Sequence, residues 1–256
     1  MREVPAVPIL VYHDVSPRPH PAFQRYTVTV RAFALQMRWL ALFGYKAIDM
    51  DALFRARGGR GSLPKRPVLI TFDDGLQGCV EHAVPVLRTH GFTAVFYLVT
   101  GLMGKTSRWM VPELGVELPL MNWDTARALV AEGFQCGAHT VTHPRLAGLD
   151  DTRCRAELVG ARRQLEEELD RPALHLAYPF GSYDRTVQEI AADAGYRTAC
   201  STRPGLSEPG DDALALHRIS VYGHESPLDF VSRLRSGAGV RERLAYAFGR
   251  GRGAGL

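Results

Sequence analysis

The sequence predicts an α/β fold with a core of parallel strands. Predicted strands and helices alternate along most of the chain, which is typical of a parallel sheet. The apolar run at residues 68–70 contains no polar residue, as expected of a strand that is covered on both faces. Polar clusters directly follow several predicted strands, and barrel and open α/β enzymes build their sites at these carboxyl ends.

The first half of the chain predicts three strands and two helices. Phe33, Met37 and Leu40 recur at helical spacing, and Gly44 marks the end of this helix. A segment rich in Gly and Arg, residues 55–64, predicts an exposed loop. The other predicted elements are strands over residues 8–15, 67–72 and 93–99 and a helix over residues 81–90.

The second half begins with a long irregular passage over residues 100–120, and loops of that length usually carry function. Helical periodicity follows over residues 122–133, with Asn122 or Asp124 near its start. The other predicted elements are a helix from Asp150 or Asp151 to about residue 170, a helix over residues 186–194, and strands over residues 134–138, 174–178, 197–201 and 216–221.

Composition and charge are those of an ordinary globular protein. Of the 256 residues, 46% are hydrophobic and 23% are charged, and a formal net charge of +4 does not indicate a nucleic-acid-binding protein. The four cysteines form no C-x-x-C pair, so we expect reduced thiols and neither a zinc ribbon nor a disulfide framework. Residues 231–256 are rich in arginine and predict a basic C-terminal helix and a flexible tail.

No apolar run is long enough to span a bilayer, so we expect no membrane span. The start of the chain shows no signal-peptide pattern, because Pro8 interrupts its short apolar run. We therefore expect a cytoplasmic protein, or a secreted one if a leader has been removed. The sequence carries no signal for an oligomeric state.

Two carboxylates, Asp73 and Asp74, follow the predicted strand at residues 67–72, and Gly75 comes next. Neighbouring strand residues point in opposite directions, so one carboxylate could hold a metal while the other handles a proton. The alternative is a strand followed by a simple Asp-Gly turn.

A second candidate pair, His139 and His143, lies four residues apart directly after a predicted strand. That spacing can bring both imidazoles to one ion, with Asp74 as the third ligand. Two histidines, one carboxylate and an open position are typical of a catalytic metal site. The alternative is two histidines that cap a loop, because an H-x-x-x-H pair alone is not specific.

Three motifs occur in order along the chain: Thr-Phe-Asp-Asp-Gly at residues 71–75, His-Thr-Val-Thr-His-Pro at residues 139–144 and Tyr-Pro-Phe-Gly at residues 178–181. This combination resembles the polysaccharide deacetylase family, carbohydrate esterase family 4, whose domain is also called the NodB homology domain. The resemblance covers residues 8–221 and implies a deacetylase domain at residues 1–230. It also implies an irregular (β/α)7-type barrel with a parallel strand core.

The resemblance implies roles for individual residues. Asp73 would be the catalytic base, and the backbone N–H of Phe180 would stabilise the oxyanion. The metal ligands would be Asp74, His139 and His143. The groove would be lined by Tyr178 and Pro179, and Trp109, in the long loop, is a candidate for its wall. For Tyr178 the alternative is a buried hydroxyl bonded to the backbone.

The general acid has two candidates. Most of the family places it near the C-terminus in a Leu-x-His motif, which His217 could supply, although its spacing is one residue longer. A branch that deacetylates poly-N-acetylglucosamine has a circularly permuted arrangement, with the acid on an N-terminal strand. Residues 11–15 resemble that strand, so we favour His13, with Asp14 as a residue that could orient it.

One position departs from the family pattern. Many members have an arginine close before the third motif, ahead of its tyrosine and proline positions, and this arginine orients the catalytic aspartate. Ala177 stands there in this chain, so the role is vacant or filled from elsewhere. The permuted branch shares this departure, which therefore argues for a subtype.

The resemblance implies a metal-dependent hydrolase that removes N-acetyl groups from amino sugars of a glycan or a glycan precursor. The expected cofactor is a divalent metal, Zn²⁺ first, with Co²⁺, Ni²⁺ or Fe²⁺ as alternatives, because bound zinc lowers the pKa of water to about 7. The alternative functions are a deformylase or O-acetyl esterase acting on a small or lipid-linked sugar, and an inactive carbohydrate-binding barrel.

Overall fold

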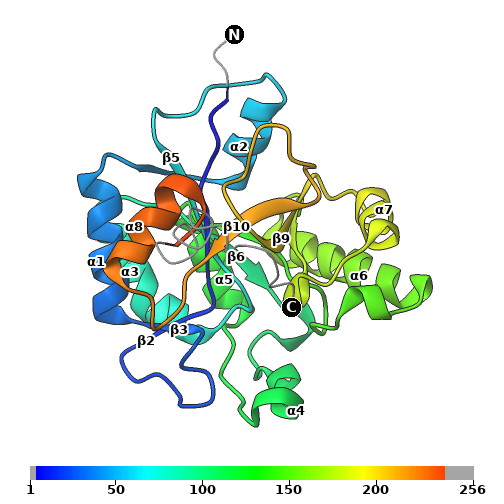
Figure 1. Ribbon diagram of the computed structural model, residues 1–256. Helices are drawn as coiled ribbons and strands as arrows, with labels where there is room; N and C mark the ends of the chain where they lie inside the picture. Colours follow the sequence, from blue (N-terminus) through cyan, green and yellow to red (C-terminus); the bar gives the residue numbers. More distant parts are fainter. Residues whose placement is uncertain (1–3, 240–256) are drawn as a thin grey trace, which may run out of the picture.

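Parallel strands close into a barrel in the computed structural model, which describes residues 4–239 (Figure 1). The main sheet has eight strands in the order β1-β10-β9-β8-β7-β6-β5-β4, and β1 also pairs with β5. That pairing closes a ring of seven strands and leaves β4 outside it, so the predicted barrel is confirmed. The ring strands are β1 (Ile9–Tyr12), β5 (Pro67–Phe72), β6 (Val95–Leu98), β7 (Gln135–Ala138), β8 (His175–Ala177), β9 (Thr198–Pro204) and β10 (Leu216–Ser220).

Two short strands, β3 and β4, were absent from the prediction, and a third, β2, is the end of the first predicted strand. β4 (Lys46–Ile48) pairs in parallel with the first half of β5. β2 (Asp14–Ser16) and β3 (Thr27–Thr29) form a separate parallel pair beyond the carboxyl end of β1. The first predicted strand therefore divides at His13, which lies between β1 and β2.

Helices surround the strands, and several begin at residues that the sequence predicts as caps. Asn122 and Asp150 accept hydrogen bonds from the first turns of α5 and α6. Phe33, Met37 and Leu40 are buried on one face of α1, as expected. The helices are α1 (Val30–Leu42), α2 (Met50–Arg57), α3 (Val84–His90), α4 (Val111–Leu114), α5 (Trp123–Ala131), α6 (Asp151–Leu169), α7 (Arg185–Asp193) and α8 (Pro227–Ser236).

The two faces of β5 pack into different clusters. Val68, Ile70 and Phe72 lie in the large cluster between strands and helices. Leu69 lies in a second cluster, formed by side chains that point toward the barrel axis. Because side chains alternate along a strand, Asp73 continues the row of residues that face the barrel axis.

Helix α8 packs against the barrel at the domain boundary predicted at residue 230. The helix crosses that boundary, and Phe230 and Leu234 on its inner face are buried in the large cluster. The tail predicted beyond it falls on residues 240–256, outside the described residues. Within residues 4–239, no helix combines the length and apolar character needed to cross a bilayer.

The long passage after β6 folds over the carboxyl ends of the strands. It contains α4 and the short turns η2 (Thr100–Leu102) and η3 (Arg108–Met110). A third hydrophobic cluster joins this passage to the loop before β3 through Met110, Leu120 and Phe23. Tyr26 and Trp109 are partly buried against this cluster, so two aromatic side chains border the same end of the barrel.

Candidate active site

The carboxyl end of β5 places both aspartates next to β1. Tyr12 pairs in register with Phe72, and the Asp73 N–H donates to the Tyr12 carbonyl at 2.9 Å. Asp74 then turns away with a φ of 73°, in the left-handed region that most side chains avoid. This turn separates the two carboxylates, and both are buried.

Asp74, His139 and His143 converge at one point. Oδ1 of Asp74 lies 3.4 Å from Nε2 of His139 and 3.2 Å from Nε2 of His143. All three side chains are buried, and within residues 4–239 they form the one cluster of three or more potential metal-binding side chains, with ligand atoms within 4.8 Å of one another. The structure thus brings together the three residues that we expected to hold a metal.

The loop that carries the two histidines has support that the sequence did not reveal. Thr140 and His143 both have positive φ, 67° and 65°, and the His143 N–H donates to Thr140 Oγ1 at 2.9 Å. The Glu157 carboxylate on α6 accepts from the N–H groups of Val141 (2.8 Å) and Thr142 (2.9 Å). A buried left-handed backbone costs about 1–3 kcal/mol per residue, so such bonds are needed to hold it.

The donor set fits a divalent cation. Nδ1–H of His139 donates to the Ala177 carbonyl at 2.7 Å, which leaves Nε2 as an acceptor when the ring is neutral. Nε2 then faces Asp74 Oδ1, another acceptor, so a proton or a metal cation must lie between them. Nδ1 of His143 is buried without a hydrogen-bond partner among the described residues.

Electrostatics keep Asp74 and His143 in the forms that bind metal. Burial would raise the pKa of Asp74, but hydrogen bonds from His139 and His143 outweigh it and hold that pKa far below its usual range. Burial lowers the pKa of His143, which favours its neutral form. An ionised carboxylate and a neutral imidazole are the forms that bind metal. At His139 the Asp74 and Asp73 carboxylates outweigh burial and raise the pKa, so an ion that binds there displaces a proton.

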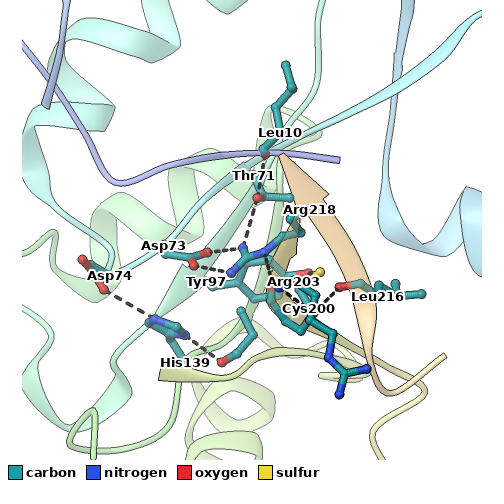
Figure 2. Close-up of polar contacts among 12 residues, drawn as sticks. Leu10, Thr71, Asp73, Asp74, Tyr97, His139, Cys200, Arg203, Leu216 and Arg218 are labelled. Atoms are coloured by element: carbon teal, nitrogen blue, oxygen red, sulfur yellow. Dashed lines mark hydrogen bonds and ion pairs between the residues drawn. The ribbon is translucent and has the colours of Figure 1, made fainter. Parts of the chain in front are cut away.

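Arg218 fills the orienting role that Ala177 cannot perform. Its guanidinium binds both oxygens of Asp73, at 2.8 Å to Oδ1 and 2.7 Å to Oδ2 (Figure 2). Arg218 is 1% exposed, and its Nε–H donates to the Ser201 carbonyl at 2.9 Å, so the guanidinium is itself held in place. Ala177 contributes instead its carbonyl oxygen, to His139.

Arg218 also sets the charge of Asp73. Burial is the largest single influence and would raise the pKa of this carboxyl, but the charge and hydrogen bonds of Arg218, together with His139 and His13, outweigh burial, and the pKa is lowered. Asp73 is therefore ionised and fixed in direction. We did not anticipate Arg218; the available signal was a charged residue on the inward-facing side of the predicted strand at residues 216–221.

His13 lies at the same end of the barrel as Asp73 and Asp74. The register of β1 and β5 sets it beside Asp73, one residue beyond the Tyr12–Phe72 pair. Its carbonyl accepts from the Cys79 thiol at 3.1 Å, which holds its backbone. The Asp14 carboxylate accepts from Thr27 Oγ1 at 3.2 Å, and within residues 4–239 no hydrogen bond joins it to His13, so Asp14 does not orient that ring.

His217 lies away from this group, contrary to its candidacy as the acid. It is the second residue of β10, near the amino end of a strand whose carboxyl end faces the site. Its Nδ1 is 3.0 Å from Asp211 Oδ2, and its ring lies against Gly205. A parallel barrel keeps the two ends of its strands apart, so His217 does not reach the triad.

The third motif contributes one side chain to the site surface. Tyr178 is fully buried, and its hydroxyl donates to the Leu214 carbonyl at 3.0 Å, so its expected place in the groove was wrong. Pro179 is buried as well. Phe180 is 38% exposed and holds a φ of 57° in the turn η5 (Pro179–Gly181).

Aromatic rings enclose His143. Trp109 stacks on it with ring centroids 4.5 Å apart, and Phe180 meets it edge-on at 4.7 Å. The Arg145 guanidinium lies 4.0 Å from the centroid of the Phe180 ring. Trp109 is half-buried, as a wall of the site would be, whereas Trp123 packs against the large cluster.

The chain is similar to known deacetylases in sequence and in fold. The profile of the polysaccharide deacetylase family matches residues 60–199. The poly-β-1,6-N-acetyl-D-glucosamine N-deacetylase of Staphylococcus aureus (strain MRSA252) is 29% identical over 207 residues, which cover 77% of this chain and 69% of that protein.

Two solved structures superpose over nearly the whole barrel. The Streptococcus pyogenes deacetylase PplD, in complex with acetate, has a TM-score of 0.78 at 25% identity and covers 90% of this chain and 99% of its own. IcaB from Ammonifex degensii has a TM-score of 0.75 at 25% identity and covers 91% of this chain and 97% of its own. With more than half of its length matched by the family profile, the chain belongs to the polysaccharide deacetylase family.

Proposed function

We propose that this protein is a metal-dependent N-deacetylase that acts on N-acetylated amino sugars of a glycan. The observation that carries the proposal is the buried triad Asp74, His139 and His143 beside a carboxylate, Asp73, that Arg218 holds ionised. The names of relatives agree, since they include a poly-β-1,6-N-acetyl-D-glucosamine N-deacetylase and a chitooligosaccharide deacetylase.

The triad residues would hold the ion, and two imidazoles with one carboxylate are a donor set that suits Zn²⁺. When bound, a divalent ion supplies Lewis acidity and lowers the pKa of coordinated water to about 7. We propose zinc as the resident ion on this ground.

The protein's own groups then divide the proton transfers. Asp73 accepts a proton from the attacking water, and the backbone N–H of Phe180 stabilises the oxyanion that forms on the acetyl carbonyl. A new C–O bond to the acetyl carbon replaces the amide C–N bond. His13 donates a proton to the departing nitrogen, which leaves acetate and a sugar with a free amine.

The alternative substrates share this chemistry and differ in the group released. A deformylase would release formate, and an O-acetyl esterase would release acetate from an ester without forming an amine. A binding barrel would release nothing. Assays of the released acid and of the free amine therefore distinguish these functions.

The direct test is an assay of acetate and free amine with β-1,4- and β-1,6-linked N-acetylglucosamine oligomers as substrates. We expect both products in equal amounts from the wild type and neither from His139→Ala. Turnover of an N-formylated or O-acetylated sugar but of none of the N-acetylglucosamine oligomers, or oligomer binding with no release at all, would contradict the proposal.

A further inference from the structure

A group of aromatic side chains continues from His13 to the surface of the protein. The rings of His13 and Tyr26 lie 5.3 Å apart, and those of Tyr26 and Tyr222 lie 6.1 Å apart. Tyr222 stacks on His224 with ring centroids 5.8 Å apart. Tyr26 and Tyr222 are half-buried and His224 is exposed. We call Tyr26, Tyr222 and His224 the aromatic strip.

The strip is built from two loops that are locked together. One loop precedes β3 and the other follows β10, and the Gly223 N–H donates to the Arg25 carbonyl at 2.9 Å. A Cβ at Gly223 would collide with the backbone carbonyls of Gln24 and Thr27, so only glycine allows this approach. Binding by a surface that is already ordered loses less conformational entropy.

The position of the proposed acid determines where the substrate binds. His13 protonates the departing nitrogen, and that nitrogen remains attached to the sugar. The sugar that loses its acetyl group must therefore lie beside His13. The next sugar of the same glycan then reaches Tyr26 and Tyr222, whose half-buried side chains offer apolar ring edges and polar hydroxyl groups.

We propose that the aromatic strip is a subsite for the sugar unit next to the one that loses its acetyl group. The protein then acts on a glycan chain in preference to a single amino sugar. This inference rests on the proposed function, and specifically on His13 as the acid.

Arg25 determines the charge of the preferred neighbouring sugar. Its guanidinium lies 5.6 Å from the Tyr26 ring centroid and 5.1 Å from that of Tyr222. Arg25 is exposed and forms no salt bridge within residues 4–239. A neighbouring sugar that has already been deacetylated carries a positive amine and is repelled, so the subsite favours a neutral, acetylated neighbour.

The test compares kcat/KM for acetate release from N-acetylglucosamine and from its pentamer. We expect the wild type to favour the pentamer, and Tyr222→Ala to reduce the ratio of the two constants about tenfold, as loss of one aromatic contact predicts. Tyr222→Phe keeps the ring and should restore the ratio. Arg25→Gln should narrow, about twofold, the preference for a fully acetylated over a partly deacetylated pentamer.

Tyr45→Ala is the matched control, because Tyr45 is a half-buried tyrosine directly before β4, at the opposite end of the strands. It should leave the ratio unchanged. A wild-type ratio near one, or an unchanged ratio in Tyr222→Ala, overturns the subsite while leaving the proposed function intact.

Pentamer binding separates the two hypotheses if no acetate is released. Ligand-observed NMR with the wild type and with Tyr222→Ala measures binding without turnover. Binding that is lost in Tyr222→Ala supports the subsite even if the proposed function fails. Binding that is equal in both proteins, or absent from both, overturns it.

Discussion

At the residue scale, the position of the proposed base depends on a single arginine. Asp73 and Arg218 are both buried, and two hydrogen bonds join them across the barrel interior. A two-point contact fixes the plane of the carboxylate as well as its charge, which a lysine could not do. Arg218 is thus a positioning residue that acts through Asp73.

We expect Arg218→Met to lower kcat about 10–100-fold while the metal content stays at the wild-type level. The acid limb of the pH–rate profile should move to higher pH, because the pKa of Asp73 rises once the arginine charge is lost. The measurements are a kcat profile from pH 4 to pH 8 and metal analysis of the same sample.

Arg218→Met also leaves a buried carboxylate without its partner, which costs about 3–5 kcal/mol of folding stability. The double variant Asp73→Asn with Arg218→Met removes both charges and should recover much of that loss in denaturant unfolding. An unmoved acid limb in a folded Arg218→Met protein would contradict the positioning role.

The choice of general acid gives a second prediction at this scale. His13→Ala should reduce turnover about 10²–10⁴-fold, the usual contribution of a positioned acid, with metal retained. His217→Ala should keep substantial activity, since His217 is bound to Asp211 near the amino end of β10. The reverse pattern in acetate release would refute the assignment of His13.

At the element scale, the loop that carries His139 and His143 depends on α6. Glu157 accepts the backbone N–H groups of Val141 and Thr142 and so holds the loop between the two ligands. We expect Glu157→Ala to weaken metal affinity about 10–100-fold, as is usual when support of a ligand is removed. Competition with a chromogenic chelator measures this affinity.

Glu167→Ala is the control for that experiment. Glu167 lies on the same helix and forms an exposed ion pair with Arg163, at 3.4 Å. Exposed pairs of this kind contribute about 1 kcal/mol or less, so the variant should bind metal like the wild type. Equal weakening in the two variants would mean that α6 as a whole, and not Glu157, supports the loop.

Helix α2 is tied to the amino end of the barrel by an ionisable pair. Asp51 Oδ1 lies 3.1 Å from Nε2 of the buried His175, and Asp51 Oδ2 accepts from Gln135 at 2.9 Å. The hydrogen bond from His175 lowers the pKa of Asp51, although burial opposes it. This contact stabilises the fold in the ionised state of Asp51.

The lowered pKa of Asp51 determines how the stabilisation by this contact changes with pH. A carboxyl whose pKa is lower in the folded state stabilises the protein above its unfolded pKa, about 3.9, and this effect disappears as the pH falls through the folded value. Metal-free wild type should therefore exceed Asp51→Asn in stability by about 1 kcal/mol or less at pH 5. In thermal unfolding, a difference that fails to shrink between pH 5 and pH 2 would contradict this account.

At the scale of the whole molecule, much of the architecture follows from local patterns. The buried run at residues 68–70, the helix caps and the polar strand ends all lie as predicted, because each depends on periodicity within one element. The three motifs also identified the triad. Each of these features can be read within a short stretch of sequence.

The pairing of Asp73 with Arg218 could not be read in the same way. The two residues are 145 positions apart, and they meet only because β1 joins β5 and β10 to close the ring. The burial of Tyr178 likewise follows from strand pairing, since β8, β9 and β10 are neighbours in the sheet and the Tyr178 hydroxyl reaches Leu214 in the segment before β10. Contacts between elements far apart in the sequence thus determine the partner of Asp73 and the position of Tyr178, which the motifs alone could not predict.

Removing the metal tests directly whether Asp74, His139 and His143 hold an ion on which deacetylation depends. Acetate release from an N-acetylglucosamine pentamer is measured before chelation, after chelation and after one equivalent of Zn²⁺ is returned, with metal content determined at each step. We predict that activity is lost with the ion and restored with it, and that His139→Ala retains neither. Full acetate release by the metal-free protein, or one tightly held equivalent in His139→Ala, would contradict this prediction.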